Sequence, residues 1–348
     1  MALGTSHGGR AAVFSLTMLV GLGGPALPAR GQEAAPYFKG KQIRLYVGSA
    51  TGGGYDAFAR LIAAYINRHI PGQPNIIVQN MPGAGSLVLA NHVYNLGPKD
   101  GTEIGAVNPQ ISTDPMFHSD RVKFDPRKFN WIGSALRENH VGVAWHTTSI
   151  KTFDDAFKTA LVVAGSGGST DTYPNFTNGL LDTRFKVVSG YKGTKEGMLA
   201  MERGEVTGNV GITWASLKAT GGEWLRNKQV HVFIQFGLTK HPELPDVPWI
   251  YDYARNDDDR AAMDLVFASQ EFGRPYVAPP GVPEPIVAIL RNAFDETMND
   301  REFQADAARR QLDLEPVSGA EIQKIMDNIY KASPAVIGRV KKILADKI

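Results

Sequence analysis

Short apolar runs alternate with amphipathic segments along most of this chain, from Gln42 onward. Each run is bounded by turn-forming residues, which is the pattern of buried strands. The predicted strands are Ile43–Val47, Asn75–Gln79, Thr102–Val107, Val141–Trp145, Leu161–Ala164, Phe185–Val188, Val206–Val210, Val230–Phe236 and Pro275–Ala278. Helices are expected between them. Regular alternation of strands and helices predicts an α/β fold with parallel sheets and helices on both faces.

The clearest helix pattern follows the first strand. Its apolar residues recur at i, i+3, i+4, i+7 and i+8, which places them on one face. They are Phe58, Leu61, Ile62, Tyr65 and Ile66.

The last third of the chain changes character after Pro279-Pro280-Gly281. Amphipathic patterns predict helices over Pro283–Asn299 and Arg301–Leu312. A third helix is expected to begin at Ser318, because the spacing to Glu321 is that of a capping box, and Pro334 interrupts it. We expect these helices to cover the sheet of the first domain.

The N-terminus is expected to be removed from the folded protein. Ala11–Leu22 is a short apolar run after a weakly basic start, and Gly, Pro and small residues follow it. This pattern predicts a secretory signal peptide over residues 1–31, cleaved between about Ala26 and Ala35, and therefore a periplasmic protein. A disordered cytosolic tail is the alternative.

Composition excludes several classes of function. The chain has 37 Lys and Arg against 35 Asp and Glu, and residues 1–31 contain Arg10, Arg30 and no acid, so 35 bases face 35 acids after cleavage. A nucleic-acid-binding protein would usually show a basic surplus. There is no cysteine, which excludes disulfides and thiolate metal sites.

Two glycine-rich turns carry the candidate chemistry. Gly52-Gly53-Gly54 lies between the first strand and its helix, and Gly165–Asp171 follows the Leu161–Ala164 strand in the same way. Helix N-termini present free N–H groups and a positive dipole end, so both turns suit an anion. Facing each other across a cleft, they would bind one anion between two domains.

Other readings of the first turn remain open. Gly52–Ala57 fits the dinucleotide fingerprint G-x-G-x-x-A, but the second strand ends in Gln79-Asn80 where that fingerprint needs an acid. We therefore expect no cofactor. A purely structural turn is a further alternative, and Asp56 would either cap the helix or face the ligand.

No hydrolase, kinase-type or zinc-protease motif is present in the sequence, and the histidines are scattered. An enzyme acting on a carboxylate would need an acid–base pair, for which Asp56, Asp171 and Lys192 are the candidates. We therefore expect neither an enzyme nor a metal site.

The chain resembles the substrate-binding proteins of tripartite tricarboxylate transporters, the Bug receptors of Gram-negative periplasms. The matching segments occur in the family's order over nearly the whole chain after the signal peptide. They are Gly52–Arg60 for G-G-x-x-D-x-x-A-R, Asn80–Gly85 for N-x-P-G-A-G, Pro98–Thr102 for P-x-D-G-T, Tyr191–Gly193 for Y-K-G, Gly204–Val206 for G-E-V, Leu244–Pro248 for L-P-D-V-P and Ala278–Pro283 for A-P-x-G-x-P.

The resemblance implies a two-lobed periplasmic-binding-protein fold of the Venus-flytrap kind, with two parallel-rich mixed sheets flanked by helices. Lobe one would comprise residues 36–139 and 239–348, and lobe two residues 140–238. The implied ligand is a small carboxylate: a di- or tricarboxylate, an aromatic acid or an amino acid. The implied partner is a two-subunit membrane permease, and the implied oligomeric state is a monomer. A ligand-presenting sensor is the alternative.

The resemblance also implies where the carboxylate binds, between the loop of the first strand and the glycine loop of the second lobe. The candidate ligand-binding residues are Ser49, Thr51, Gly53, Gly54, Tyr55, Asp56, Ser86, Asn108, Ser166, Gly168, Ser169 and Thr170. The chain departs from the family pattern nearby, at Ser49-Ala50-Thr51 and Asp171-Thr172-Tyr173. These departures leave the identity of the ligand open.

Overall fold

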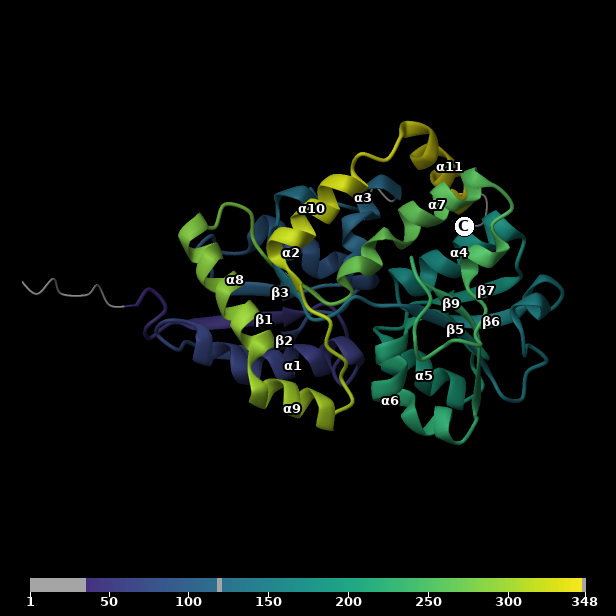
Figure 1. The fold of residues 1–348 in the computed structure, drawn as a ribbon, viewed down its shortest axis with the longest axis horizontal. Coiled ribbons are helices and arrows are strands. Elements are labelled where there is room, and N and C mark those ends of the chain that lie inside the picture. The colour runs from purple at the N-terminus through teal and green to yellow at the C-terminus, as the bar shows by residue number, and fades with distance from the viewer. Residues whose placement is uncertain (1–35, 118–120, 346–348) are drawn as a thin grey trace, which may run out of the picture. The chain divides into compact units, whose positions relative to one another are not determined.

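A computed structural model describes residues 36–117 and 121–345, and the expected signal peptide lies outside them. The strands in these residues form two separate sheets (Figure 1). The strands are β1 (Gln42–Val47), β2 (Asn75–Asn80), β3 (Glu103–Ala106), β4 (Asn130–Ser134), β5 (His140–Trp145), β6 (Leu161–Gly165), β7 (Phe185–Ser189), β8 (Gly208–Thr213), β9 (Val230–Phe236), β10 (Pro275–Ala278) and β11 (Val317–Ser318).

The first sheet has six strands in the order β11-β4-β10-β3-β1-β2. Strand β1 pairs in parallel with β2 and β3, whereas β10 pairs antiparallel with β3 and β4. Because β1 lies between two parallel partners, its carboxyl end and those of β2 and β3 meet at one edge. The loops that follow β1 and β3 therefore lie side by side.

The second sheet has five strands in the order β7-β6-β8-β5-β9. Strand β6 pairs in parallel with β7 and β8, and β5 pairs antiparallel with β8 and β9. The strands of this sheet all come from residues 140–236. Residues 135–139 lead directly from β4 to β5, so the chain passes from one sheet to the other without a helix.

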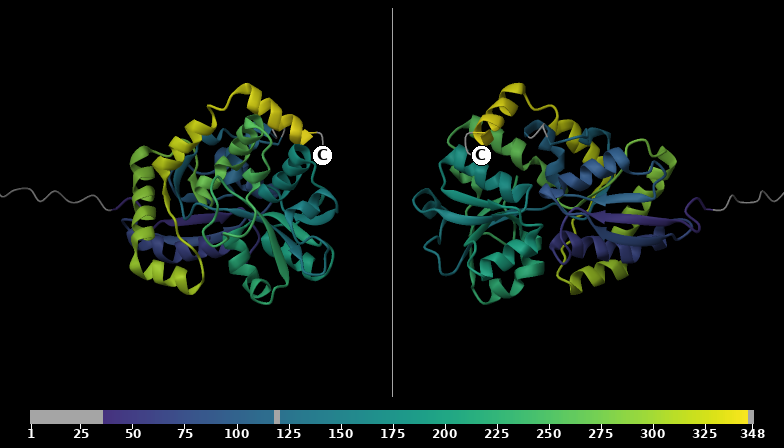
Figure 2. Two further views of the ribbon diagram at one scale, coloured as in Figure 1. Left: turned by 45° about the vertical axis from the view of Figure 1, so that its right-hand side comes forward. Right: turned by 180° about the vertical axis from the view of Figure 1, so that it is seen from behind.

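Helices flank both sheets (Figure 2). They are α1 (Gly54–Ile66), α2 (Leu87–Leu96), α3 (Asp114–Phe117), α4 (Ser169–Leu181), α5 (Thr194–Glu202), α6 (Trp214–Arg226), α7 (Asp257–Phe267), α8 (Glu284–Asn299), α9 (Arg301–Arg309), α10 (Gly319–Ile329) and α11 (Pro334–Ala345). The predicted apolar face of α1 is largely buried, with Phe58 and Leu61 at 0% exposure. Within the described residues, none of these helices combines the length and apolarity needed to cross a membrane.

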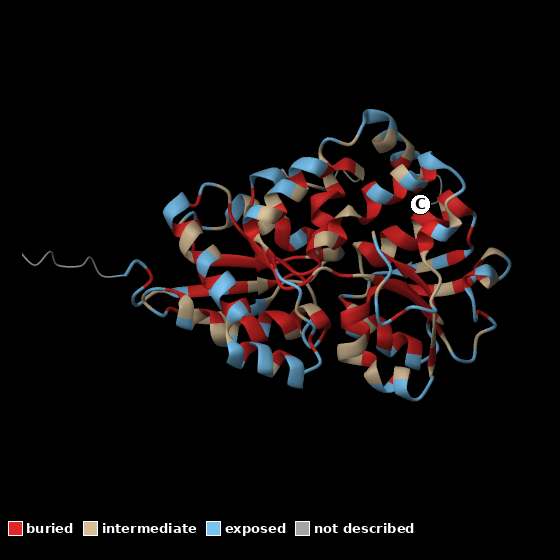
Figure 3. Ribbon diagram, viewed as in Figure 1, coloured by how far each residue is buried: buried red, intermediate tan, exposed pale blue. Residues whose placement is uncertain are grey.

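The buried residues follow the strands of both sheets and the helix faces that cover them (Figure 3). Helices α8 and α10 contact β4, and α1 contacts β1 and β2. The aromatic rings of Tyr173 and Phe236 contact Phe267 of α7, so α7 packs against elements of the second sheet. The assignment of residues 239–348 to lobe one therefore stays a prediction, together with the other lobe boundaries.

The prediction of two mixed sheets flanked by helices is confirmed. Among the described strands, five neighbouring pairs are antiparallel and four are parallel, so neither sheet has the surplus of parallel pairs that the alternation suggested. The reason is that five strands run antiparallel to all of their neighbours, namely β4, β5, β9, β10 and β11. The sequence patterns did not predict β4 and β11.

The C-terminal helices differ from the prediction at their end. Ser318 caps α10 as expected, because its hydroxyl accepts the Glu321 N–H at 3.2 Å. Pro334 then begins a separate helix, α11, which packs on α3, α4 and α7 rather than on the first sheet. Proline has no N–H to continue the preceding helix, so the chain can turn at this point.

Candidate functional site

A cavity of about 40 Å³ lies between loops that follow strands of the two sheets. Its lining comprises Gly48, Ser49, Tyr55, Gly85, Ser86, Asn108, Ser166, Gly167, Ser169, Thr170, Lys192, Gly193, Thr194, Gly211, Ile212 and Thr213. Seven of the predicted site residues belong to this set: Ser49, Tyr55, Ser86, Asn108, Ser166, Ser169 and Thr170. None of the described lining residues is acidic, and Lys192 carries the one basic side chain among them.

The first sheet contributes the loops after β1 and β3. The Ser49 hydroxyl is buried and has no hydrogen-bond partner within the described residues. Asn108 accepts the Gln110 N–H through its side-chain oxygen at 2.9 Å, which directs the amide group of the side chain. Ser86 is already engaged, because it donates to the Gly48 carbonyl and accepts the Asn108 N–H, both at 3.0 Å. Ser49 and the Asn108 amide are therefore the donors available to a ligand on this side.

The second sheet contributes the glycine loop after β6. The Thr170 hydroxyl accepts the Ser166 N–H at 2.8 Å and donates to the Gly167 carbonyl at 3.0 Å. Ser169 donates to the Gly211 carbonyl at 2.9 Å. These bonds hold the loop in shape. Gly167 and Gly168 have φ values of +81° and +60°, a conformation that glycine adopts without the strain other residues incur.

Four helix N-termini meet around the cavity. Tyr55 lies in the first turn of α1, Ser169 and Thr170 begin α4, Thr194 begins α5, and Thr213 is the N-cap of α6. Each first turn has N–H groups without a partner in its own helix, and each helix dipole is positive at this end. The cavity is therefore surrounded by partial positive charge, which favours an anion.

Five of the predicted site residues do not line the cavity. They are Thr51, Gly53, Gly54, Asp56 and Gly168. Thr51 is exposed, Gly53 is the N-cap of α1, and Gly168 adjoins the Asn108 side chain. A Cβ on Gly54 would lie 2.2 Å from the Ser216 hydroxyl, so this glycine allows α1 to approach α6 closely.

Asp56 closes its own loop instead of facing the cavity. Its carboxylate accepts the Gly52 N–H at 2.8 Å, the Asn80 amide at 2.9 Å and the Arg60 guanidinium at 2.9 Å. Burial opposes ionisation, but these hydrogen bonds outweigh it and lower the pKa of Asp56. Because a fixed negative charge occupies this turn, the structure does not favour a pyrophosphate there.

The two sides of the site touch each other through their backbones. The Ala50 N–H donates to the Lys192 carbonyl at 3.1 Å, and the Gly85 N–H donates to the Ser166 carbonyl at 3.2 Å. Ala50 and Gly85 belong to loops of the first sheet, and Lys192 and Ser166 to loops of the second. The cavity is thus enclosed by loops of both sheets.

Sequence reasoning missed part of the lining. Gly211, Ile212 and Thr213 lie at the end of β8, which was expected to end at Val210. Lys192 and Gly193 belong to the Y-K-G motif, which supported the resemblance but was not assigned to the ligand site. Lys192 is also the one candidate acid–base residue that lines the cavity, since Asp56 and Asp171 do not. In the described part of the chain, no cluster of His, Cys, Asp or Glu could hold a metal ion.

Comparisons with known proteins agree with this geometry. The family model described as "Tripartite tricarboxylate transporter family receptor" matches residues 58–341. No curated protein sequence matches the chain.

Three solved structures resemble the fold closely, and each covers 88% of this chain. The periplasmic binding protein BugD has a TM-score of 0.68 at 20% identity, with 98% of its chain covered. A protein of R. palustris solved with adipate has a TM-score of 0.67 at 18% identity and 97% coverage. MatC from Rhodopseudomonas palustris with bound malate has a TM-score of 0.65 at 19% identity and 100% coverage. At these identities the similarity shows the fold.

The family match covers most of the chain, and the fold agrees with it. The chain belongs to the receptor family of tripartite tricarboxylate transporters.

Proposed function

We propose that this protein captures a small carboxylate in the cavity between its two sheets and delivers it to a membrane permease of the tripartite tricarboxylate type. The site of action would be the periplasm, reached through the expected signal peptide, and the partner would be a permease of two subunits. The receptor would act as a monomer. Malate and adipate in the structures of the two R. palustris proteins support a carboxylate as the ligand class.

The observation that carries this proposal is the composition of the cavity. Its described lining combines hydroxyl and amide donors with the N-termini of α1, α4, α5 and α6, and it contains no acidic side chain. Each hydrogen bond from such a donor to a carboxylate contributes roughly 1.5–3 kcal/mol. Several of them, reduced by the costs of ordering and desolvation, are sufficient for binding at about micromolar concentration.

The size of the cavity also bears on the mechanism. About 40 Å³ is room for roughly three water molecules, which is comparable to one carboxylate group. A ligand therefore enters when the lobes separate, and its carboxylate holds the two loops together once they close. Contacts made to both lobes at once favour the closed state through differential affinity.

Thermal unfolding of the purified protein tests this function. The ligands are acetate, L-malate, succinate, citrate, adipate, benzoate and L-aspartate. NAD and ATP are the controls, because a carboxylate receptor should not bind them. A ligand at about one hundred times its dissociation constant adds roughly 2.7 kcal/mol of stability, which raises the midpoint by about 2 °C or more. We expect a shift with at least one carboxylate. A shift only with NAD or ATP would contradict the receptor function.

A further inference from the structure

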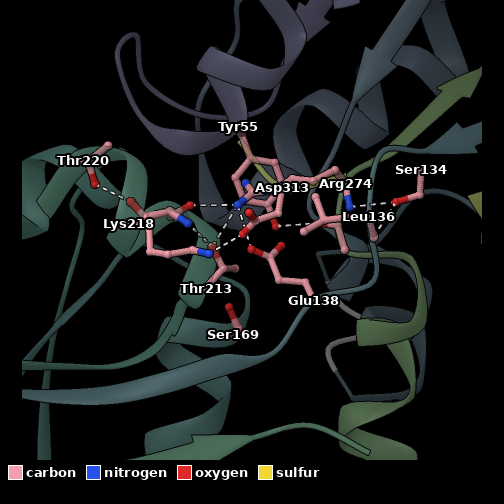
Figure 4. A network of polar contacts seen from close by, with 12 residues as sticks. Tyr55, Ser134, Leu136, Glu138, Ser169, Thr213, Lys218, Thr220, Arg274 and Asp313 are labelled. Carbon is pink, nitrogen blue, oxygen red and sulfur yellow. Dashed lines mark hydrogen bonds and ion pairs between the residues drawn. The ribbon is translucent and has the colours of Figure 1, made fainter. Parts of the chain in front are cut away.

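A buried arginine, Arg274, belongs to a polar network that includes Tyr55, Glu138 and Thr213 (Figure 4). Arg274 is 2% exposed and precedes β10. Its Nη2 donates to the Thr213 hydroxyl at 2.9 Å, and the face of the Tyr55 ring lies 4.0 Å from its guanidinium carbon. Thr213 and Tyr55 both line the cavity. The guanidinium is therefore separated from a ligand by one side chain.

The acid that pairs with Arg274, Glu138, does not face the ligand cavity. Glu138 accepts a hydrogen bond from the same Nη2 at 2.8 Å, and its side chain is 1% exposed. Glu138 does not line the ligand cavity but a separate cavity of about 210 Å³. Nε and Nη1 of Arg274 have no hydrogen-bond partner in the described residues. The guanidinium of Arg274 is therefore nearer to the ligand cavity than the carboxylate of Glu138.

The described lining contributes no acid that would offset this cation, although Glu196 accepts the N–H of the lining residue Lys192 at 2.8 Å. Asp56 is held by Gly52, Asn80 and Arg60, and the described lining contains no acid. The ammonium group of an amino acid would need a carboxylate or several free acceptors to replace its hydration. The described lining offers it hydroxyl and carbonyl acceptors but no carboxylate.

We propose that Arg274 sets the charge selectivity of this receptor, so that the cavity accepts carboxylates without an ammonium group and rejects amino acids. The inference rests on the proposed function and narrows its ligand class. Arg274 is a positioning residue, because it acts on the ligand through Thr213, Tyr55 and its own field. A unit charge separated from the ligand by one side chain, at the effective dielectric of a protein site, changes affinity by about 10- to 100-fold.

The test compares matched ligands that differ by one amino group: acetate with glycine, L-malate with L-aspartate, and adipate with 2-aminoadipate. Calorimetry near neutral pH gives both dissociation constants of each pair. Removing either member of the pair leaves the other buried without a counter-ion, which is destabilising. In E138Q the glutamine oxygen can still accept the Arg274 hydrogen bond, which limits this cost. The informative comparison is therefore E138Q with the double variant E138Q/R274Q, which lacks the Arg274 charge and also its hydrogen bonds to Thr213 and Ser216. R137Q is the control. It removes a charge from the segment that joins β4 to β5, and Arg137 pairs with Glu271 and Glu321 rather than with residues that line the ligand cavity.

We expect the wild type to bind the amino-free member of a pair at least about tenfold more tightly than its amino acid. E138Q should widen this ratio several-fold, because the guanidinium loses its counter-charge. E138Q/R274Q should lose about 10- to 100-fold in carboxylate affinity and narrow the ratio by about tenfold. R137Q should leave the ratio unchanged.

Two results would overturn the inference. One is a wild type that binds the amino acid as tightly as its amino-free partner. The other is an equal loss for both members of the pair in E138Q/R274Q, since a merely structural role of Arg274 would weaken all ligands alike. A wild type that binds no carboxylate at all would instead contradict the proposed function itself, and the inference with it.

Discussion

Single residues determine how closely the two sides of the site approach. Gly85 has a φ of +63°, and a Cβ on it would lie 2.2 Å from the Gly168 nitrogen on the opposite loop. Gly167 faces Gly85 in the same way, with a Cβ that would lie 2.2 Å from the Gly85 nitrogen. The cavity closes because neither loop carries a side chain at this contact.

Gly85→Ala should therefore weaken ligand binding by about tenfold or more, because the added methyl group keeps the loops apart. The matched control is Gly204→Ala. Gly204 has a similar φ of +73°, but nothing lies within 4 Å of its Cβ position. Both variants incur the backbone strain of a left-handed alanine, so their unfolding midpoints should fall alike. Calorimetry with the best carboxylate checks the prediction, and equal affinities for the two variants would refute it.

The sequence predicted residues that line the cavity where local pattern determines position, and their role in ligand binding stays a prediction. Ser49, Ser166 and Thr170 adjoin glycine turns at strand ends, and the structure brings them together at the cavity. Asp56 also lies beside such a turn, but its partner Asn80 comes from β2, so only tertiary contacts show that it faces its own loop. Arg274 was not predicted, because a single arginine before a strand has no sequence feature that marks it as buried.

At the scale of elements, the short helix α3 carries an unusual acid. Asp114 is 7% exposed and lies beneath α11, which packs on α3. Burial raises the pKa of Asp114 from its usual value of 3.8 to about 7. The folded protein therefore binds a proton here that the unfolded chain releases at lower pH.

This shift predicts a pH dependence of stability. The contribution of Asp114 is fully present below about pH 4 and is lost as the pH rises through about 7, because ionisation then occurs in a buried site. Asp114→Asn mimics the protonated form. It should match the wild type at low pH and be more stable above about pH 7, by up to about 4 kcal/mol. Urea denaturation at both ends of this range measures the difference, and a constant difference across it would contradict the assignment.

Elements with a strong local pattern were predicted well, and those that depend on distant partners were not. Strands such as β1 and β9 are apolar runs between turns, and the structure has them within one residue of the prediction. β11 has two residues and exists because Val317 and Ser318 pair with β4. The position of α11 likewise depends on a surface formed by α3, α4 and α7, which no periodicity within α11 reveals.

At the scale of the whole molecule, the described chain passes between two sheets and places the ligand cavity where their loops meet. Alternating strands and helices predicted the sheets, and the resemblance to a receptor family predicted two lobes. The antiparallel direction of β4 and β5 could not be predicted, because their partners are distant in the sequence: β10 and β11 for β4, and β8 and β9 for β5. The same crossing brings Glu138 and Arg274 together behind the cavity.

The most direct test of this account is a crystal structure of the protein with the carboxylate that stabilises it most. The account predicts the carboxylate between the two loops, within hydrogen-bonding distance of the Ser49 hydroxyl and the Asn108 amide, with Thr213 and Arg274 behind it. A ligand bound elsewhere, for example in the cavity of about 460 Å³ beside Asp114 and Asn175, would contradict it.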